Sequence, residues 1–297
     1  MRIGTWLDIS GLSMPEITTA ARSAGKTGYA TLWFGEVGTW DPLTVLAVIA
    51  REVPEVRLGT AIVRTYPRHP LALAAQALTI QAASGGRLAL GLGPSHAPII
   101  EGQYGRPFTA PARNMREYLS ALMPLLRGEP VDYRGEHWTA AGQLDLPGAQ
   151  PPTVLVSALG PRMLELTGEL ADGVITTWAG PRALGERLLP SLLRAAERAG
   201  RASPEVVAQA PVCVTDDPDG VRARVSDELK AAGELPSYRA IFELQGMAGP
   251  GDTVIAGDEA TVRRAIQRFA DVGVTEFLAT PVGSAEEKDR TLAVLAT

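Results

Sequence analysis

Several side chains able to do chemistry stand a few residues after the apolar runs of this chain. Glu36 follows the run 30–34, Arg64 follows the run 57–62, and His96 ends the segment Gly91-Leu-Gly-Pro-Ser-His96. Glu36 could orient a substrate or donate a proton to it, and it could equally cap its loop or pair with an arginine. Glu36 and His96 are therefore the two catalytic candidates, with both roles of Glu36 open.

The other residues at these positions are small or carry hydroxyls, and carboxylates and histidines are scarce. The chain has three histidines, at positions 69, 96 and 137, and no H-E-x-x-H or comparable metal-ligand spacing. A hydrolase would need a charge relay, a metal cluster or a carboxylate pair. The pattern instead favours a large planar cofactor with a phosphate, which supplies the reactivity while the protein supplies shape and orientation, and it predicts no metal site.

The elements that must position these residues are short, buried strands alternating with helices. Ser13 and Asp41 are typical N-caps, each followed closely by proline. The strand-like runs are eight: 2–7, 30–34, 57–62, 88–92, 153–157, 173–177, 206–214 and 275–280. Because these runs are apolar throughout and do not alternate with polar residues, we expect a parallel sheet covered on both faces.

Eight such units in 297 residues predict an α/β fold, a (β/α)8 TIM barrel forming one domain over residues 1–297. A doubly wound sheet is the alternative, but Gly91 and Gly93 lack the third glycine of a dinucleotide fingerprint. Residues 129–152 interrupt the alternation of strands and helices and are expected to form a small insertion, with a hairpin over 131–138.

The overall composition limits the partners that this chain would have. Lysines and arginines number 28 against 33 acidic residues, a formal net charge of −5, and no dense basic run is present. This excludes a typical nucleic-acid surface. No apolar stretch reaches about 18 residues, so no membrane contact is expected. The first residues lead straight into a strand-like run without a signal-peptide layout, which favours a cytoplasmic protein acting on a small-molecule substrate.

In a barrel, the residues after each strand converge on one mouth, where ligands bind. Aromatic and basic side chains there are candidates for the substrate pocket. They are Trp6, Trp40, Arg64 and Trp178.

Five motifs in order along the chain carry a family resemblance. They are Leu32-Trp-Phe-Gly-Glu36, Leu58-Gly-Thr-Ala61, Tyr66-Pro-Arg-His-Pro70, Leu90-Gly-Leu-Gly-Pro-Ser-His96 and Glu169-Leu-Ala-Asp-Gly173. Together they resemble the bacterial luciferase-like superfamily and, within it, the actinobacterial oxidoreductases that depend on the deazaflavin coenzyme F420. The resemblance covers nearly the whole chain and implies a TIM barrel that is usually a homodimer.

The resemblance also implies where the cofactor lies. Its ring would stack in the mouth against a bulged third strand, with a non-proline cis peptide expected at Thr60-Ala61. Gly93, Ser95 and His96 would border it. The implied contacts of its chain are Ser157, Ala158, Leu159 and Gly160, and those of its phosphate are Thr177, Ala179 and Gly180, with free amides near Pro181.

The resemblance favours a reductase that transfers hydride from reduced deazaflavin to an activated C=C or C=N bond. The sugar-phosphate dehydrogenase branch has an Asp-His pair after the second strand, whereas this chain has Glu36 and Val37. An FMN-dependent monooxygenase on the same barrel is the alternative. A non-catalytic barrel that binds a flavin or another ligand is the alternative of a different class.

Overall fold

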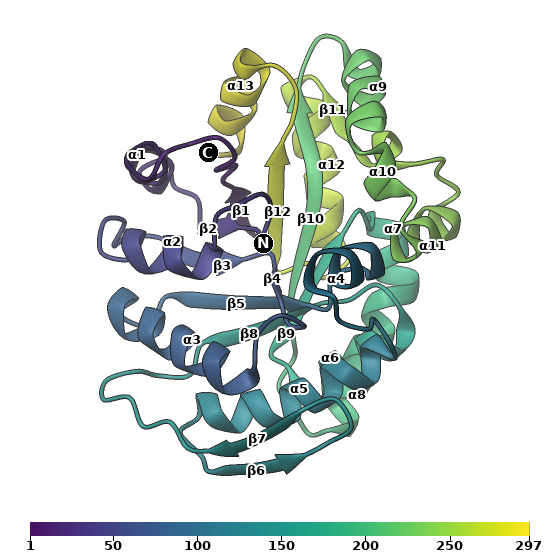
Figure 1. The fold of residues 1–297 in the computed structure, drawn as a ribbon. Helices are drawn as coiled ribbons and strands as arrows, with labels where there is room; N and C mark the ends of the chain where they lie inside the picture. Colours follow the sequence, from purple (N-terminus) through teal and green to yellow (C-terminus); the bar gives the residue numbers. More distant parts are fainter. Residues whose placement is uncertain (297) are drawn as a thin grey trace.

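A computed structural model describes residues 1–296 and contains a closed parallel barrel (Figure 1). Within these residues the eight barrel strands are β1 (Arg2–Trp6), β2 (Thr31–Phe34), β3 (Arg57–Thr60), β5 (Leu88–Gly93), β8 (Thr153–Ser157), β9 (Gly173–Thr177), β10 (Glu205–Val214) and β12 (Glu276–Pro281). They are hydrogen-bonded in the order β10-β12-β1-β2-β3-β5-β8-β9, and β9 pairs with β10 to close the barrel. The predicted (β/α)8 barrel is confirmed.

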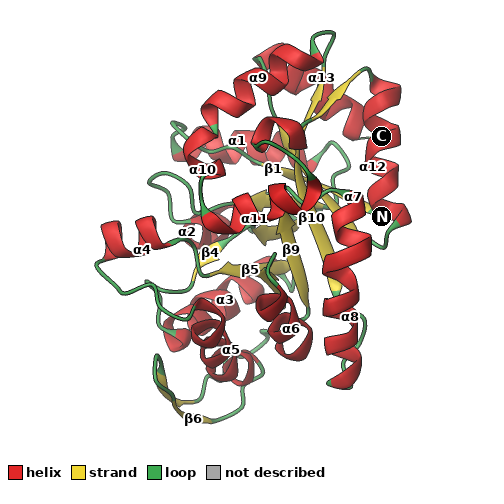
Figure 2. Cartoon of the chain, turned by 90° about the vertical axis from the view of Figure 1, so that its right-hand side faces the viewer, coloured by secondary structure: helices red, strands yellow, loops and turns green. Residues whose placement is uncertain are grey.

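Helices surround the barrel and cover its strands from outside (Figures 1 and 2). Their bounds are α1 (Met14–Gly25), α2 (Pro42–Ile49), α3 (Pro70–Ser84), α4 (Ala97–Tyr104), α5 (Pro111–Leu126), α6 (Pro161–Leu170), α7 (Pro181–Ala183), the π-helix η1 (Leu184–Leu188), α8 (Leu189–Arg198), α9 (Pro218–Glu228), α10 (Lys230–Gly233), α11 (Pro236–Gln245), the 3-10 helix η2 (Pro250–Thr253), α12 (Glu259–Asp271) and α13 (Ala285–Leu295). Asp41 caps α2 as predicted, because its Oδ1 accepts the Thr44 N–H at 2.7 Å. Over residues 1–296 no helix combines the length and the hydropathy that crossing a membrane requires.

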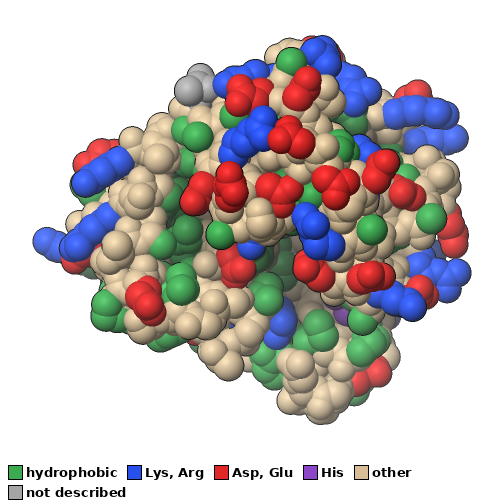
Figure 3. Space-filling view, turned by 90° about the horizontal axis from the view of Figure 1, so that it is seen from above, with side chains coloured by type: hydrophobic (Ala, Val, Ile, Leu, Met, Phe, Trp, Pro, Cys, Tyr) green, Lys and Arg blue, Asp and Glu red, His purple; other side chains and the backbone are tan. Residues whose placement is uncertain are grey.

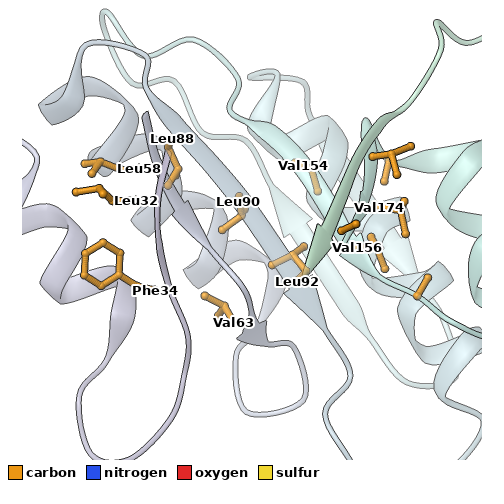
Figure 4. Packing of buried hydrophobic residues seen from close by; sticks show 14 of the residues in the cluster. Leu32, Phe34, Leu58, Val63, Leu88, Leu90, Leu92, Val154, Val156 and Val174 are labelled. Atoms are coloured by element: carbon orange, nitrogen blue, oxygen red, sulfur yellow. The ribbon is translucent and has the colours of Figure 1, made fainter. Parts of the chain in front are cut away.

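Alternate residues of the strands face two separate apolar layers. Figure 4 shows the outward side chains, among them Leu32, Leu58, Leu90 and Val154, which pack between the sheet and the helices. The inward side chains fill the barrel itself and are Trp33, Ala89, Leu155, Ile175, Val207 and Leu278. Burial of both faces explains why the strands read as continuous apolar runs.

A polar network centred on a buried carboxylate closes the end of the barrel where the strands begin. Glu276 is fully buried, and its Oε1 accepts the Trp33 Nε1–H at 2.7 Å while its Oε2 accepts the Arg2 Nε–H at 3.1 Å. Arg57 donates to Glu205 at 2.7 Å beside them. We name these five residues the barrel floor. Because the floor is filled, a ligand can enter only at the opposite end, the mouth.

The third strand contains the bulge that the resemblance implied. β3 ends at Thr60, and β4 (Val63–Arg64) resumes pairing with β5 after the bulge. The cis peptide joins Ala61 to Ile62, so the prediction at Thr60-Ala61 was wrong by one residue. The physical reason is that the Ala61 N–H still donates to the Phe34 carbonyl at 2.8 Å, so regular contact with β2 extends through residue 61.

The predicted insertion is a hairpin, β6 (Val131–Arg134) paired antiparallel with β7 (Thr139–Gly142). The hairpin is confirmed, but its second strand begins beyond residue 138. Glu117 explains this, because its buried carboxylate accepts the backbone N–H groups of Glu136, His137 and Trp138 at 3.2, 2.7 and 3.2 Å. These three residues therefore form the turn. A further short strand, β11 (Ile255–Gly257), was not predicted.

Candidate functional site

The base of the mouth is apolar and closely packed. Trp6, Ala61 and Ile62 are partly buried and lie on the inward layer of the barrel. A Cβ atom on Gly93 would lie 2.9 Å from Ile62 Cδ1 and 3.3 Å from Ser157 Cβ, so the bulge, Gly93 and Ser157 adjoin. The structure thus brings together residues of β1, β3, β5 and β8 that the sequence placed at the mouth.

A line of uncharged polar side chains crosses the other side of the mouth. The Thr177 hydroxyl donates to Gln209 Oε1 at 3.1 Å, and Gln209 Nε2 donates to the Thr280 hydroxyl at 3.1 Å. All three side chains are partly exposed. Gln209 was missed by the sequence analysis, although it stands two residues after the inward Val207 and so shares its face.

Thr60 is buried, and its hydroxyl is used within the sheet. It donates to the Gly91 carbonyl at 2.8 Å and accepts the Gly91 N–H at 2.8 Å. A Cβ at position 91 would lie 1.9 Å from the Thr60 carbonyl oxygen, so only glycine permits this close approach. Gly91 therefore serves the bulge rather than a phosphate loop.

Glu36 lies in a charged cluster at the rim of the mouth. Its Oε2 accepts from Arg68 Nη1 at 2.7 Å and from the Arg64 backbone N–H at 2.8 Å. Arg68 Nη2 also donates to Asp41 Oδ2 at 2.5 Å. Burial opposes ionisation of Asp41, but hydrogen bonds from Thr44 and Arg68 outweigh it and lower the pKa of that carboxyl. This arrangement favours the second role left open for Glu36, that of an arginine partner that orders the loop.

His96 belongs to an aromatic cluster that joins α4 to α11. Its ring centroid is 5.0 Å from that of Tyr238, which is 4.4 Å from that of Trp178. Trp178 also contacts Phe242 at 5.5 Å. Burial, and then the charge of Arg64, lower the pKa of His96, so its imidazole is neutral near pH 7. A neutral imidazole can donate or accept a hydrogen bond but carries no extra proton.

Gln245 links helix α11 to the loop after β9 through side-chain hydrogen bonds. Gln245 Nε2 donates to the Trp178 carbonyl at 2.9 Å and the Ile241 carbonyl at 3.0 Å, and its Oε1 accepts the Gly180 N–H at 2.6 Å. An amide group predicted to be free for a phosphate is thus occupied by this side chain. Gln245 and Tyr238 are not among the predicted site residues, because the sequence pattern predicts no helix over residues 236–245.

The remaining predicted site residues differ in how much space surrounds them and in whether their polar groups already have partners. Gly160 caps α6, and a Cβ there would meet nothing within 4 Å. Ala158 and Ala179 are buried, Leu159 is partly buried against the core, and Ser95 has a φ of 66°. Trp40 donates its Nε1–H to the Leu12 carbonyl at 3.1 Å, so its indole supports the loop before α1.

Comparison with known proteins decides the family. A family model described as luciferase-like monooxygenase matches residues 1–294. The chain belongs to the luciferase-like monooxygenase family.

Relatives of this luciferase-like oxidoreductase differ in cofactor. A Mycobacterium tuberculosis protein named "putative coenzyme F420-dependent oxidoreductase" is 29% identical over 97% of this chain and 96% of its own. The F420-dependent tetrahydromethanopterin reductase of Methanopyrus kandleri has a TM-score of 0.82 at 22% identity, covering 100% of this chain and 97% of that one. The oxygenating constituent of 3,6-diketocamphane monooxygenase from Pseudomonas putida, solved with FMN, has a TM-score of 0.77 at 17% identity, covering 100% and 97%. The two structural likenesses show the fold alone.

The luciferase-like chain also has a groove outside its mouth, of about 670 Å³ between α9 and α13. Acidic and basic side chains mix on this face, which Figure 3 views from above. Arg224 pairs with Glu287 at 3.3 Å and Arg290 with Asp216 at 3.5 Å inside it. Both arginines of the groove are therefore paired, and its five acidic side chains outnumber them. Among residues 1–296, no group of three or more histidines, cysteines and carboxylates is placed to hold a metal ion.

Proposed function

We propose that this luciferase-like oxidoreductase is a coenzyme F420-dependent reductase that transfers hydride to an activated C=C or C=N bond of a small molecule. The observation that carries the proposal is the mouth itself. Its base is built from uncharged side chains over a bulged third strand, and the carboxylates of Glu36 and Asp41 at its rim are paired with Arg68. Such a site offers shape and hydrogen bonds but no strong acid or nucleophile of its own, so a cofactor must supply the reactivity.

The residues present fit a planar cofactor with a long polar chain. Ala61, Gly93 and Ser157 give the base of the mouth a small, uncharged lining, and a Cβ at Gly160 would meet nothing within 4 Å. The Thr177–Gln209–Thr280 line offers hydrogen-bonding groups without charge. We propose the following cofactor contacts: Ala61, Gly93, Ser95, His96, Ser157, Ala158, Leu159, Gly160, Thr177, Ala179 and Gly180. Gly180 would lie beside the phosphate without donating its N–H, which Gln245 accepts. Thr60 would act by holding the bulge in place.

When bound, the reduced deazaflavin supplies the hydride, and one proton from solvent completes addition across the double bond. The neutral imidazole of His96 is suited to donate a hydrogen bond to the substrate and so to polarise that bond. Glu36 would position the rim through Arg68 and the Arg64 backbone. Helix α11 would exclude water from the side of the mouth that Tyr238 covers.

An FMN-dependent monooxygenase is the second candidate. The similarity in fold to the FMN-bound monooxygenase of Pseudomonas putida supports it. Both candidates use the same mouth, but only the second consumes oxygen.

Anaerobic turnover separates the two. Purified protein is mixed with reduced F420 and a panel of α,β-unsaturated ketones and cyclic imines, and the absorbance of the oxidised deazaflavin is followed. Stoichiometric formation of the saturated product without oxygen supports the reductase. Turnover only with reduced FMN and oxygen would contradict it, and binding of F420 without turnover of any panel member would favour a non-catalytic barrel.

A further inference from the structure

Arg64 occupies a distinct position at the rim of the mouth. It ends β4, where it lies in register with Gly93 of β5, and the next residue, Thr65, donates its N–H to the Gly93 carbonyl at 3.0 Å. Its backbone is therefore fixed beside the loop that leads to His96. The side chain is half-buried rather than extended into solvent.

The guanidinium group of Arg64 contacts only neutral acceptors. Its Nη2 donates to the Glu36 carbonyl at 2.8 Å, and its Nη1 donates to the Tyr104 hydroxyl at 3.3 Å. Within residues 1–296 no carboxylate oxygen lies within 4.0 Å of it. Arg68, four residues later, pairs with both nearby carboxylates, those of Glu36 and Asp41. The charge of Arg68 is thus satisfied in the fold, and that of Arg64 has no anion beside it.

Partial burial of a cation without a neighbouring anion costs free energy, and an anionic ligand bound beside it would offset that cost. Arg64 is close enough to His96 for its charge to add to the effect of burial on that imidazole. Apolar surface lies around the same rim, because Tyr104 and Val37 are among the exposed large hydrophobic side chains. The ligand that suits this place has one anionic group and an apolar body.

We infer that Arg64 binds a carboxylate of the substrate, whose apolar part lies against Tyr104 and the ring of His96. The inference rests on the proposed function and names its substrate class, unsaturated carboxylic acids or imino acids. A planar guanidinium matches a carboxylate in shape and can donate two parallel hydrogen bonds to it.

A substrate carboxylate accounts for Arg64 better than the cofactor phosphate does. The proposed phosphate contacts follow β9, and β5 and β8 separate that strand from β4. Only three lysines are present in the chain, at positions 26, 230 and 288, and none is near this rim in sequence. A single cation suits a singly charged carboxylate.

The test compares ligands of one shape that differ in charge. Calorimetry measures binding of cinnamate and cinnamamide, and of 3-phenylpropanoate and its amide, to the protein with and without oxidised F420. The proteins are the wild type, Arg64→Gln, Arg64→Lys and the control Arg113→Gln, whose side chain is exposed and pairs with Glu136 on the hairpin. We expect the wild type and the control to prefer the acids by roughly tenfold or more. Arg64→Gln should lose that preference with amide binding unchanged, and Arg64→Lys should keep part of it.

Two results would overturn the inference: equal affinity for acid and amide in the wild type, or an acid preference that persists in Arg64→Gln. Loss of F420 binding in Arg64→Gln would also overturn it, since Arg64 would then serve the cofactor. An acid preference that depends on Arg64 in a protein that binds no F420 would support this inference and contradict the proposed function.

Discussion

Thr60, Glu36 and Arg64 lie at or just after the ends of neighbouring strands, yet each has a different role in the structure. The Thr60 hydroxyl joins the two sides of the bulge, and the Glu36 carboxylate holds Arg68. Of the three, Arg64 is the one whose charged side chain has no counter-ion within residues 1–296. Residue type and position after a strand could predict that these side chains lie at the mouth. Their partners depend on a bulge and on loops that strand periodicity does not specify.

The role of Thr60 can be tested by removing its hydroxyl. Thr60→Val keeps the shape of the side chain but leaves the buried Gly91 N–H and carbonyl without these partners. We expect the free energy of unfolding to fall by about 1–3 kcal/mol, measured by urea denaturation. Thr60→Ser restores the hydroxyl and should recover most of the loss. Equal stability of Thr60→Val and the wild type would contradict this role.

His96 should make stability depend on pH. Its pKa is lowered in the folded protein from the ordinary value of 6.5, first by burial and then by Arg64. As the pH falls below about 6.5, the unfolded chain therefore binds this proton before the folded protein does. The contribution is fully present above that pH and is lost as the pH falls toward the lowered pKa.

We therefore expect His96→Asn to reduce the fall in unfolding free energy between about pH 7 and about pH 5, as measured by urea denaturation across that range. Identical pH profiles for the variant and the wild type would show that His96 does not titrate differently in the two states.

At the scale of elements, α11 completes the mouth that the barrel strands begin. Its contacts run from Tyr238 to His96 and from Gln245 to the loop after β9. The eight strands could be predicted because buried runs of apolar residues are a strong signal. Helix α11 and the three-residue β11 could not, because short elements that depend on tertiary contacts leave little periodicity in the sequence. The bulge after Thr60 was expected from family resemblance. Its cis peptide lies one residue beyond the expected position, at Ala61-Ile62.

Gln245→Glu tests the link between α11 and the cofactor. The new carboxylate cannot donate to the Trp178 and Ile241 carbonyls, and it places negative charge beside Gly180, a proposed phosphate contact. We expect the Kd for F420 to rise by roughly tenfold or more in a fluorescence titration. Gln267→Glu on α12 makes the same change of charge on an exposed part of the surface and is the control. An unchanged Kd in Gln245→Glu would place the phosphate elsewhere.

At the scale of the whole molecule, the two ends of the barrel have different roles. The floor joins Arg2, Trp33, Arg57, Glu205 and Glu276 in one network. The mouth holds the uncharged polar line, the bulge and the rim arginines. This division is typical of TIM barrels, in which the end where strands begin serves stability. The homodimer expected from resemblance stays a prediction.

Glu276→Gln tests whether the barrel floor affects stability without affecting ligand binding at the mouth. It removes a buried charge that Arg2 and Trp33 contact, and Arg2 is half exposed. We expect the free energy of unfolding to fall by about 3 kcal/mol, the lower end for breaking a buried pair. Ligand affinity at the mouth should stay within about twofold of the wild type. A loss of ligand affinity in folded Glu276→Gln would show that floor and mouth are coupled.

The central claim is that the mouth is built for a deazaflavin, and a binding titration tests it most directly. Coenzyme F420 and FMN are added separately to the protein, and the intrinsic tryptophan fluorescence is followed, since Trp6 lies at the base of the mouth. We predict saturable binding of F420 with an affinity roughly tenfold or more above that for FMN. Saturable binding of FMN alone would contradict it.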